Sequence, residues 1–489
     1  MLFNSLHFLV FFPLVTLLYF AVSHDRRWFL LLVASCYFYM ALIPVYILIL
    51  FLIITIDYCV GIWIENARGK RRKLLLAVSI FANVGILSLF KYYNFFAENV
   101  LSFFGIFGVN LSLPLLSLAL PVGLSFHTFQ AMSYTIEVYR GRQKAERHFG
   151  IYALYVMFYP QLVAGPIERP QNLIRQFYER HHPDPARIID GLRMMMWGLF
   201  KKAVIADRLA VLVNHVYAQP QSFHGPLLLI ATFFFAFQIY CDFSGYSEIA
   251  CGAARVMGFK LTANFDRPYS AKSIKEFWKR WHISLSTWFR DYLYIPLGGN
   301  RTSKSRWFFN LAITFLVGGL WHGAKWTYVI WGALNGFYLI FGILTASIRR
   351  RIADRLGMSR FPSAHGIFQN FAIFFLICLS WVFFRAENIG DAFFILKSIA
   401  GSSWNTGLHQ AQYEIFRLEQ MGYWASDLVA GFWVIGILLF VERARASQSL
   451  AGIIQRGPGL LRWLVDYACI VSILVGGVFK HSPFIYFQF

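Results

Sequence analysis

Charged residues are scarce in this sequence, and acidic residues are the scarcer of the two kinds. Only 14% of the 489 residues are charged, and 24 acidic side chains stand against 45 basic ones, for a formal net charge of +21. By contrast, 58% of the residues are hydrophobic and 19% are aromatic, and the mean hydropathy is +0.53. These values lie far outside the range of soluble domains, so the chain is predicted to be a polytopic membrane protein.

Several signatures of other protein classes are missing. The six cysteines form no CxxC pair and most lie in apolar runs, which argues against a disulfide framework and against a metal site. There is no Walker motif, so this chain encodes no ATP-driven pump. The basic residues lie in short loops between apolar runs, as cytoplasmic loops do, and leave no basic folded domain for nucleic acid. The first apolar run, residues 6–22, lacks a basic leader and a cleavage site, so it is expected to be an uncleaved span.

The apolar runs predict an all-α membrane protein with about eleven transmembrane helices, plus re-entrant or interfacial helices. Residues 28–64 are expected to form two short or tilted spans joined by a tight turn. Residues 192–217 are expected to form one amphipathic or spanning helix. Residues 95–138 are interrupted by Gly and Pro, so the part that contains His127 is expected to line the interior. The whole chain, 1–489, is interpreted as a single transmembrane domain.

Two Trp–His pairs stand out within residues 272–335. Trp281–His282 lies in a segment crowded with cations and aromatic residues, whereas Trp321–His322 ends an apolar run. Histidine can accept a proton near neutral pH, so two such residues close together suggest acid–base chemistry.

The surroundings of His322 favour a functional role. A straight helix that starts at Trp307 on the basic side would place His322 roughly 22 Å higher, past the middle of the hydrocarbon core. A polar group at that depth is costly, and substrate could reach it only through a tunnel. Gly318, Gly319 and Gly323 are interpreted as removing bulk from such a path. The alternative is a packing histidine that bonds to a neighbour.

Residues 272–294, taken as one helix, place a polar stripe opposite an apolar face. One interpretation is an interfacial helix whose cations meet lipid headgroups. The other is a re-entrant helix at a cytosolic mouth, where cations attract a phosphorylated donor such as coenzyme A. Spacing alone leaves both open. The stripe consists of Lys275, Lys279, His282, Ser286 and Arg290.

Asp242 is an acidic residue inside the apolar segment YCDFSGYSEIACG. It is interpreted either as a hydrogen-bonding residue between helices or as part of a functional site, and the sequence favours neither.

Several motifs together resemble the membrane-bound O-acyltransferases, in the bacterial branch that acts in alginate O-acetylation. The resemblance extends from end to end of the chain. It rests on PVGLSFHTFQ, FYPQLVAGPI, YCDFSGYSEIACG, NFDRPYSAKSIKEFWKRWHISLSTWFRDYLYIPLGGNR, GGLWHGAKWTYVIWG, WVFFRAEN and the terminal FIYFQF.

The resemblance implies a multi-helix fold around a central tunnel in the bacterial plasma (inner) membrane. It implies that His322 and His282 are the catalytic histidines. Donor-binding or tunnel roles are predicted for Lys279, Arg290, Trp281, Trp321 and Asp242. It also implies acyl transfer from a cytosolic thioester, such as acetyl-CoA, with no bound cofactor and no metal. An extracytoplasmic SGNH-type partner would then complete the transfer to a polysaccharide.

The end of the chain, residues 480–489, carries a further expectation. The resemblance implies that Tyr486 in the tail relays the acyl group, because an aryl ester remains an activated acyl group. The alternative is an aromatic group at the membrane interface.

Two other functions compete with acyl transfer. A polysaccharide or lipid transporter or flippase is disfavoured because the chain has no convincing internal repeat. A subunit that only anchors a synthase would leave His322 unexplained. The acceptor stays open among alginate, another exopolysaccharide, cellulose and peptidoglycan.

Overall fold

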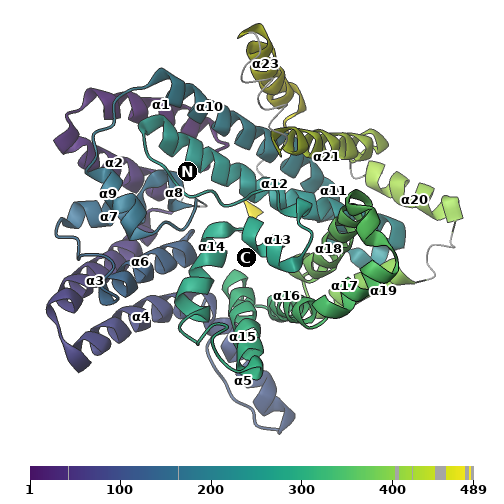
Figure 1. The fold of residues 1–489 in the computed structure, drawn as a ribbon, viewed down its shortest axis with the longest axis horizontal. Helices are drawn as coiled ribbons and strands as arrows, with labels where there is room; N and C mark the ends of the chain where they lie inside the picture. Colours follow the sequence, from purple (N-terminus) through teal and green to yellow (C-terminus); the bar gives the residue numbers. More distant parts are fainter. Residues whose placement is uncertain are drawn as a thin grey trace. The chain divides into compact units, whose positions relative to one another are not determined.

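In the computed structural model, all the regular secondary structure of the described part of the chain is helical (Figure 1). Six helices in that part are long and apolar enough to cross a membrane. This confirms the predicted fold class, an all-α polytopic membrane protein. The described residues are 1–41, 43–163, 165–401, 407–420, 422–446, 459–479 and 484–485. The six helices are Pro44–Asn66, Gly69–Lys91, Gly225–Met257, Trp326–Leu344, Pro362–Arg385 and Ala425–Ala444, and two shorter apolar helices are Leu6–Ala21 and Trp463–Gly476.

Six long apolar helices are fewer than the eleven or so spans expected, because several apolar segments are short or broken. Residues 28–64 do form two helices, α2 (His24–Met40) and α3 (Ile47–Asn66), joined by a short 3-10 turn. Residues 192–217 form a continuous helical run rather than a single α-helix. In that run a π-helical segment, η2 (Phe200–Ala206), connects α10 (Pro185–Leu199) to α11 (Asp207–Ala218).

The chain divides into two compact units, and the first comprises residues 1–195 and 246–263. Its core contains a buried polar network between α3 and α4, where Asp57 accepts hydrogen bonds from Ser79 Oγ at 2.5 Å and Asn83 Nδ2 at 2.7 Å. A buried carboxylate is tolerated when its oxygens are bonded in this way. His127 on α6 is 1% exposed, so it lies in the interior as expected. The helices of this unit are α1 (Leu6–Ala21), α2, α3, α4 (Gly69–Lys91), α5 (Tyr93–Ile106), α6 (Leu124–Tyr139), α7 (Phe149–Met157), α8 (Tyr159–Leu162), α9 (Pro170–Phe177), most of α10 and the end of α12 (Gly225–Met257).

The second unit, residues 196–245 and 264–489, contains both Trp–His pairs. Two of its helices, α15 (Lys304–His322) and α16 (Trp326–Leu344), pack at a very close approach. A Cβ on Gly319 would lie 2.3 Å from the Tyr328 carbonyl oxygen, and one on Gly332 would lie 2.4 Å from the Phe315 carbonyl oxygen. Only glycine fits at both positions. The other described helices of this unit are α11, α12 up to residue 245, α13 (Ile274–Arg280), α14 (Ile283–Phe289), α17 (Ala346–Arg355), α18 (Pro362–Arg385), α19 (Ile389–Ala400), α20 (Gly407–Gln420), α21 (Ala425–Ala446) and α23 (Gly459–Gly476), with the π-helical segments η2 and η5 (Arg290–Tyr294).

Candidate active site

The helix predicted over residues 272–294 is broken at its centre. Helix α13 ends at Arg280, and α14 begins at Ile283. Between them His282 has a φ of 43°, and it is one of two non-glycine residues with positive φ in the described part of the chain. A bulky residue rarely adopts this left-handed conformation, and such strain concentrates at functional sites. The expectation of a single continuous helix is therefore wrong.

The break separates His282 from the cations of the expected polar stripe. His282 is 1% exposed, whereas Lys275, Lys279 and Arg290 are exposed. Arg290 forms an ion pair with Asp291 at 2.7 Å. The stripe thus does not exist as one face, because the left-handed residue turns the imidazole into the protein interior. A role for Lys279 and Arg290 in donor binding stays a prediction.

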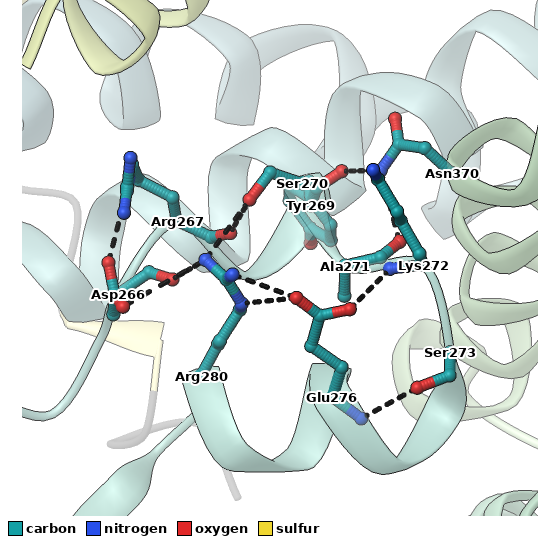
Figure 2. A network of polar contacts seen from close by, with 10 residues as sticks. All are labelled: Asp266, Arg267, Tyr269, Ser270, Ala271, Lys272, Ser273, Glu276, Arg280 and Asn370. Atoms are coloured by element: carbon teal, nitrogen blue, oxygen red, sulfur yellow. Dashed lines mark hydrogen bonds and ion pairs between the residues drawn. The ribbon is translucent and has the colours of Figure 1, made fainter. Parts of the chain in front are cut away.

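A polar network fixes the chain that leads into this break (Figure 2). Arg280 pairs with Glu276 at 2.8 Å, and its guanidinium also donates to the Asp266 carbonyl at 3.3 Å. Asn370 on α18 donates to the backbone carbonyls of Tyr269 at 2.5 Å and Ala271 at 3.1 Å. These bonds tie both ends of the segment before His282 to their neighbours, so the strained residue sits in a rigid frame.

A second set of bonds holds the chain beyond the break. Residues 264–266 run beside it, with Ile283 N donating to Asn264 O at 2.8 Å and Asp266 N donating to Arg280 O at 3.0 Å. The Ser284 hydroxyl donates to the Asn264 side chain at 2.6 Å. Backbone pairing on both sides of the left-handed residue is what over-determines its conformation.

Aromatic rings surround the His282 imidazole. Phe243 meets it edge to face with ring centroids 4.5 Å apart, and the Trp321 ring lies 6.2 Å away. Burial among these groups lowers the pKa of His282 to about 3. The imidazole is therefore neutral at physiological pH and is a weak proton acceptor there.

His322 ends helix α15 and is 5% exposed. Its ring contacts those of Trp321, Trp331 and Phe384 at centroid distances of 5.0, 5.0 and 5.2 Å. Trp321 is 4% exposed and its ring contacts both histidine rings, so the structure brings the two histidines together around one indole. Trp281, at 1% exposed, packs at 5.0 Å against Trp381 on α18.

The glycines beside His322 serve packing rather than an open path. A Cβ on Gly323 would lie 2.2 Å from the Tyr328 ring, and the space beside Gly319 is filled by the Tyr328 backbone. A Cβ on Gly318 would make only an ordinary van der Waals contact with the Phe289 ring, at 3.7 Å. The interpretation that these glycines clear a tunnel is thus wrong for two of the three positions.

A polar row on α16 was missed in the sequence. Thr327, Trp331 and Asn335 lie four residues apart and are 2%, 3% and 0% exposed. Thr327 Oγ1, Trp331 Nε1 and Asn335 Oδ1 have no hydrogen-bond partner among the described residues. Buried polar atoms are normally bonded, so a row of three whose middle member, Trp331, contacts the His322 ring is suited to a polar substrate. The i, i+4, i+8 spacing was a signal that could have been read.

Asp242 lies in a buried ion cluster in the same unit. Lys202 Nζ is 2.7 Å from Asp242 Oδ1 and 2.8 Å from Asp207 Oδ1. All three side chains are at most 3% exposed. Lys202 was also missed, although two adjacent lysines, Lys201 and Lys202, inside an apolar run are a warning of function.

Part of the C-terminal tail reaches this cluster. Ile485 N donates to Asp242 Oδ2 at 2.7 Å, and Phe484 packs against Phe243 with ring centroids 5.8 Å apart. Phe484 is 0% and Ile485 is 2% exposed. Tyr486, the expected relay residue, lies outside the described residues.

Comparison with known proteins gives one family. The family model described as MBOAT, membrane-bound O-acyltransferase family, matches residues 145–384, which include both Trp–His pairs. The chain is 38% identical to a probable alginate O-acetylase AlgI of Pseudomonas putida, over the full length of both proteins. It is 38% identical to that of Pseudomonas aeruginosa over 89% of this chain and 81% of the relative. It is also 35% identical to a peptidoglycan O-acetyltransferase of Helicobacter pylori, over 76% of this chain and 73% of the relative.

Proposed function

This chain belongs to the membrane-bound O-acyltransferase family and is an O-acyltransferase, and we propose that it passes an acetyl group from a cytosolic thioester to an extracytoplasmic polysaccharide. The relatives named for alginate and for peptidoglycan support a glycan acceptor. The donor in this proposal is acetyl-CoA. The chain lies in the plasma (inner) membrane of a bacterium in this proposal. An SGNH-type partner outside that membrane completes the transfer.

The observation that carries the proposal is the pair of buried histidines around the Trp321 ring. Acyl transfer from a thioester needs a base for the attacking hydroxyl and a site without bulk water. His322 lies at the end of α15, enclosed by three aromatic rings, which meets both needs. His282, neutral and held in a strained backbone, is the supporting residue.

In the proposed reaction His322 takes the proton from the phenol of Tyr486. The phenolic oxygen attacks the thioester carbonyl, the carbon–sulfur bond breaks, and the thiolate takes the proton back from His322. The products are free coenzyme A and an aryl ester on Tyr486. A serine hydroxyl of the partner then attacks this ester, the bond between the acyl carbon and the Tyr486 oxygen breaks, and the serine proton passes to the departing phenolate. The acyl group is then on the serine and Tyr486 is a free phenol again.

The exposed cations and the buried polar row have separate tasks in this scheme. Lys279 and Arg290 attract the phosphates of the donor at the protein surface. The polar atoms of Thr327, Trp331 and Asn335 form hydrogen bonds with the amide groups of the pantetheine chain of acetyl-CoA, which ends in the thioester.

Radiolabelled acetyl-CoA and purified protein in detergent test the proposal. Wild type should release coenzyme A and retain label on Tyr486, and adding the partner and glycan should discharge that label. Tyr486→Phe should bind donor and remain folded but fail to acetylate glycan. Normal glycan acetylation by Tyr486→Phe would remove the relay, whereas normal acetylation by His322→Ala would remove the assigned base.

A further inference from the structure

The buried cluster of Lys202, Asp207 and Asp242 contains more charge than a packing role requires. Buried carboxylates are stable only when paired, and one lysine can neutralise only one of the two. Asp242 differs from Asp207 because its second oxygen accepts the backbone N–H of Ile485 at 2.7 Å. The cluster therefore joins helix α12 and the π-helical segment η2 to the tail of the chain.

The same π-helical segment also holds the chain just before the tail. Val478 N donates to the carbonyl of Ala203 in η2 at 2.9 Å. Next to η2, the Arg208 guanidinium donates to the Gly476 carbonyl at 2.9 Å. The end of α23 is thus bound to η2 and to α11, whereas Ile485 is bound to Asp242 on α12, which pairs with Lys202 of η2 at 2.7 Å. Irregular helical turns of this kind occur often at functional sites.

The attachment lies next to His282. Phe484 contacts Phe243, and Phe243 in turn contacts the His282 ring at 4.5 Å. Lys201 flanks the cluster, with its ammonium 5.3 Å from the Tyr240 ring centroid and 3.4 Å from the Ser244 hydroxyl. Ile485 is thus anchored beside this aromatic group.

We propose that Asp242, held in place by its contact with Lys202, is a positioning residue that binds the tail through the backbone N–H of Ile485 and so presents the next residue to the histidine pair. The proposal rests on the relay proposed above, since presenting Tyr486 has a purpose only if Tyr486 accepts the acyl group. Because the bond is to backbone, the anchor recognises an extended peptide rather than a particular side chain at position 485.

Carboxypeptidase digestion of the full chain in detergent measures the anchor without reference to activity. The readout is the rate at which residues 487–489 are removed, followed by intact mass. Asp242→Leu leaves Lys202 paired with Asp207, so no buried charge loses its partner, and the removal should become at least about tenfold faster. Asp242→Asn keeps a carbonyl acceptor and should give an intermediate rate.

Two matched controls separate the anchor from simple packing. Asp207→Asn takes the other carboxylate from Lys202 but leaves the bond to Ile485, so its digestion rate should equal that of wild type. Ile485→Pro removes the N–H and should digest as fast as Asp242→Leu, whereas Ile485→Val keeps the N–H and should resemble wild type. Equal rates for Asp242→Leu and wild type, or for Ile485→Pro and Ile485→Val, would overturn the anchor.

The acyl-transfer readout is kept separate. With the relay in operation, Asp242→Leu and Ile485→Pro should lose label on Tyr486 while coenzyme A binding is unchanged. If Tyr486→Phe acetylates glycan normally, the relay fails, but the digestion rates still decide whether Asp242 holds the tail.

Discussion

The two Trp–His pairs share a dipeptide and differ in everything that surrounds it. His322 ends a regular helix of 19 residues, and close glycine contacts fix that helix against its neighbour. His282 occupies a left-handed break between two helices of seven residues each, and polar bonds on both sides fix the break. One histidine is placed by packing and the other by backbone strain, and both reach the same tryptophan ring.

This difference assigns different tasks to the two residues. His322 is the last residue of a regular helix, and its ring lies among three aromatic rings without backbone strain. His282 has aromatic neighbours and a strongly lowered pKa, because desolvation disfavours its charged form. We expect His322 to carry the proton and His282 to shape the site, and mutation of each should separate these effects.

Replacing His322 with alanine should have the largest effect. Loss of a general base lowers turnover by about 10²–10⁴-fold, and the apparent affinity for donor should change little. The turnover is measured as the rate at which the purified variant releases coenzyme A from acetyl-CoA. The control is thermal unfolding in detergent, which should match wild type. Turnover within a few-fold of wild type would exclude His322 as the base.

Replacing His282 with alanine should lower turnover less, by about tenfold, equivalent to about 1.4 kcal/mol of transition-state stabilisation. The same coenzyme A release assay measures it. The reason is that the Trp321 ring, which contacts both imidazoles, loses one of its supports. If His282→Ala were as inactive as His322→Ala, the two histidines would share the proton transfer, and the division of tasks would be wrong.

Lys279→Ala and Arg290→Ala should each raise the KM for acetyl-CoA by about two- to fivefold and leave kcat nearly unchanged. Each loses one attraction for the donor phosphates at an exposed position, where one charge contributes about 1 kcal/mol or less. Lys279→Arg and Arg290→Lys keep the charge and should restore the KM. The increase should shrink at high salt, since screening weakens the attraction in wild type as well. An unchanged KM in both alanine variants would mean that these cations only meet lipid headgroups.

Much of this contrast could be predicted from the sequence, and its limits have physical causes. The scarcity of charge predicted the helical membrane fold, and the two Trp–His pairs indicated which histidines to consider as site residues. Both signals can be read without knowing which distant residues meet in the fold. The break at His282 has no glycine to announce it, so a regular stripe was expected instead. The bond between Asp242 and Ile485 joins residues far apart in the sequence, and no local pattern predicts such a contact. The role of Asp242 was left open for that reason.

The smallest expected effect concerns the backbone, which is strained at His282 and helical at His322. It is measured by comparing a glycine variant with an alanine variant at each of the two positions. At position 282 the backbone is left-handed, so glycine avoids a cost of about 1–2 kcal/mol that alanine incurs. At position 322 the backbone is helical, where glycine is the less stable residue by up to about 1 kcal/mol. The order of unfolding temperatures in detergent should therefore reverse between the sites. The unfolding temperature of His282→Gly should be higher than that of His282→Ala by a few degrees or less. The unfolding temperature of His322→Ala should be equal to or higher than that of His322→Gly. The same order at both positions would show that strain at His282 contributes nothing measurable, and the claim that strain places this histidine would fail even if its effect on turnover survived.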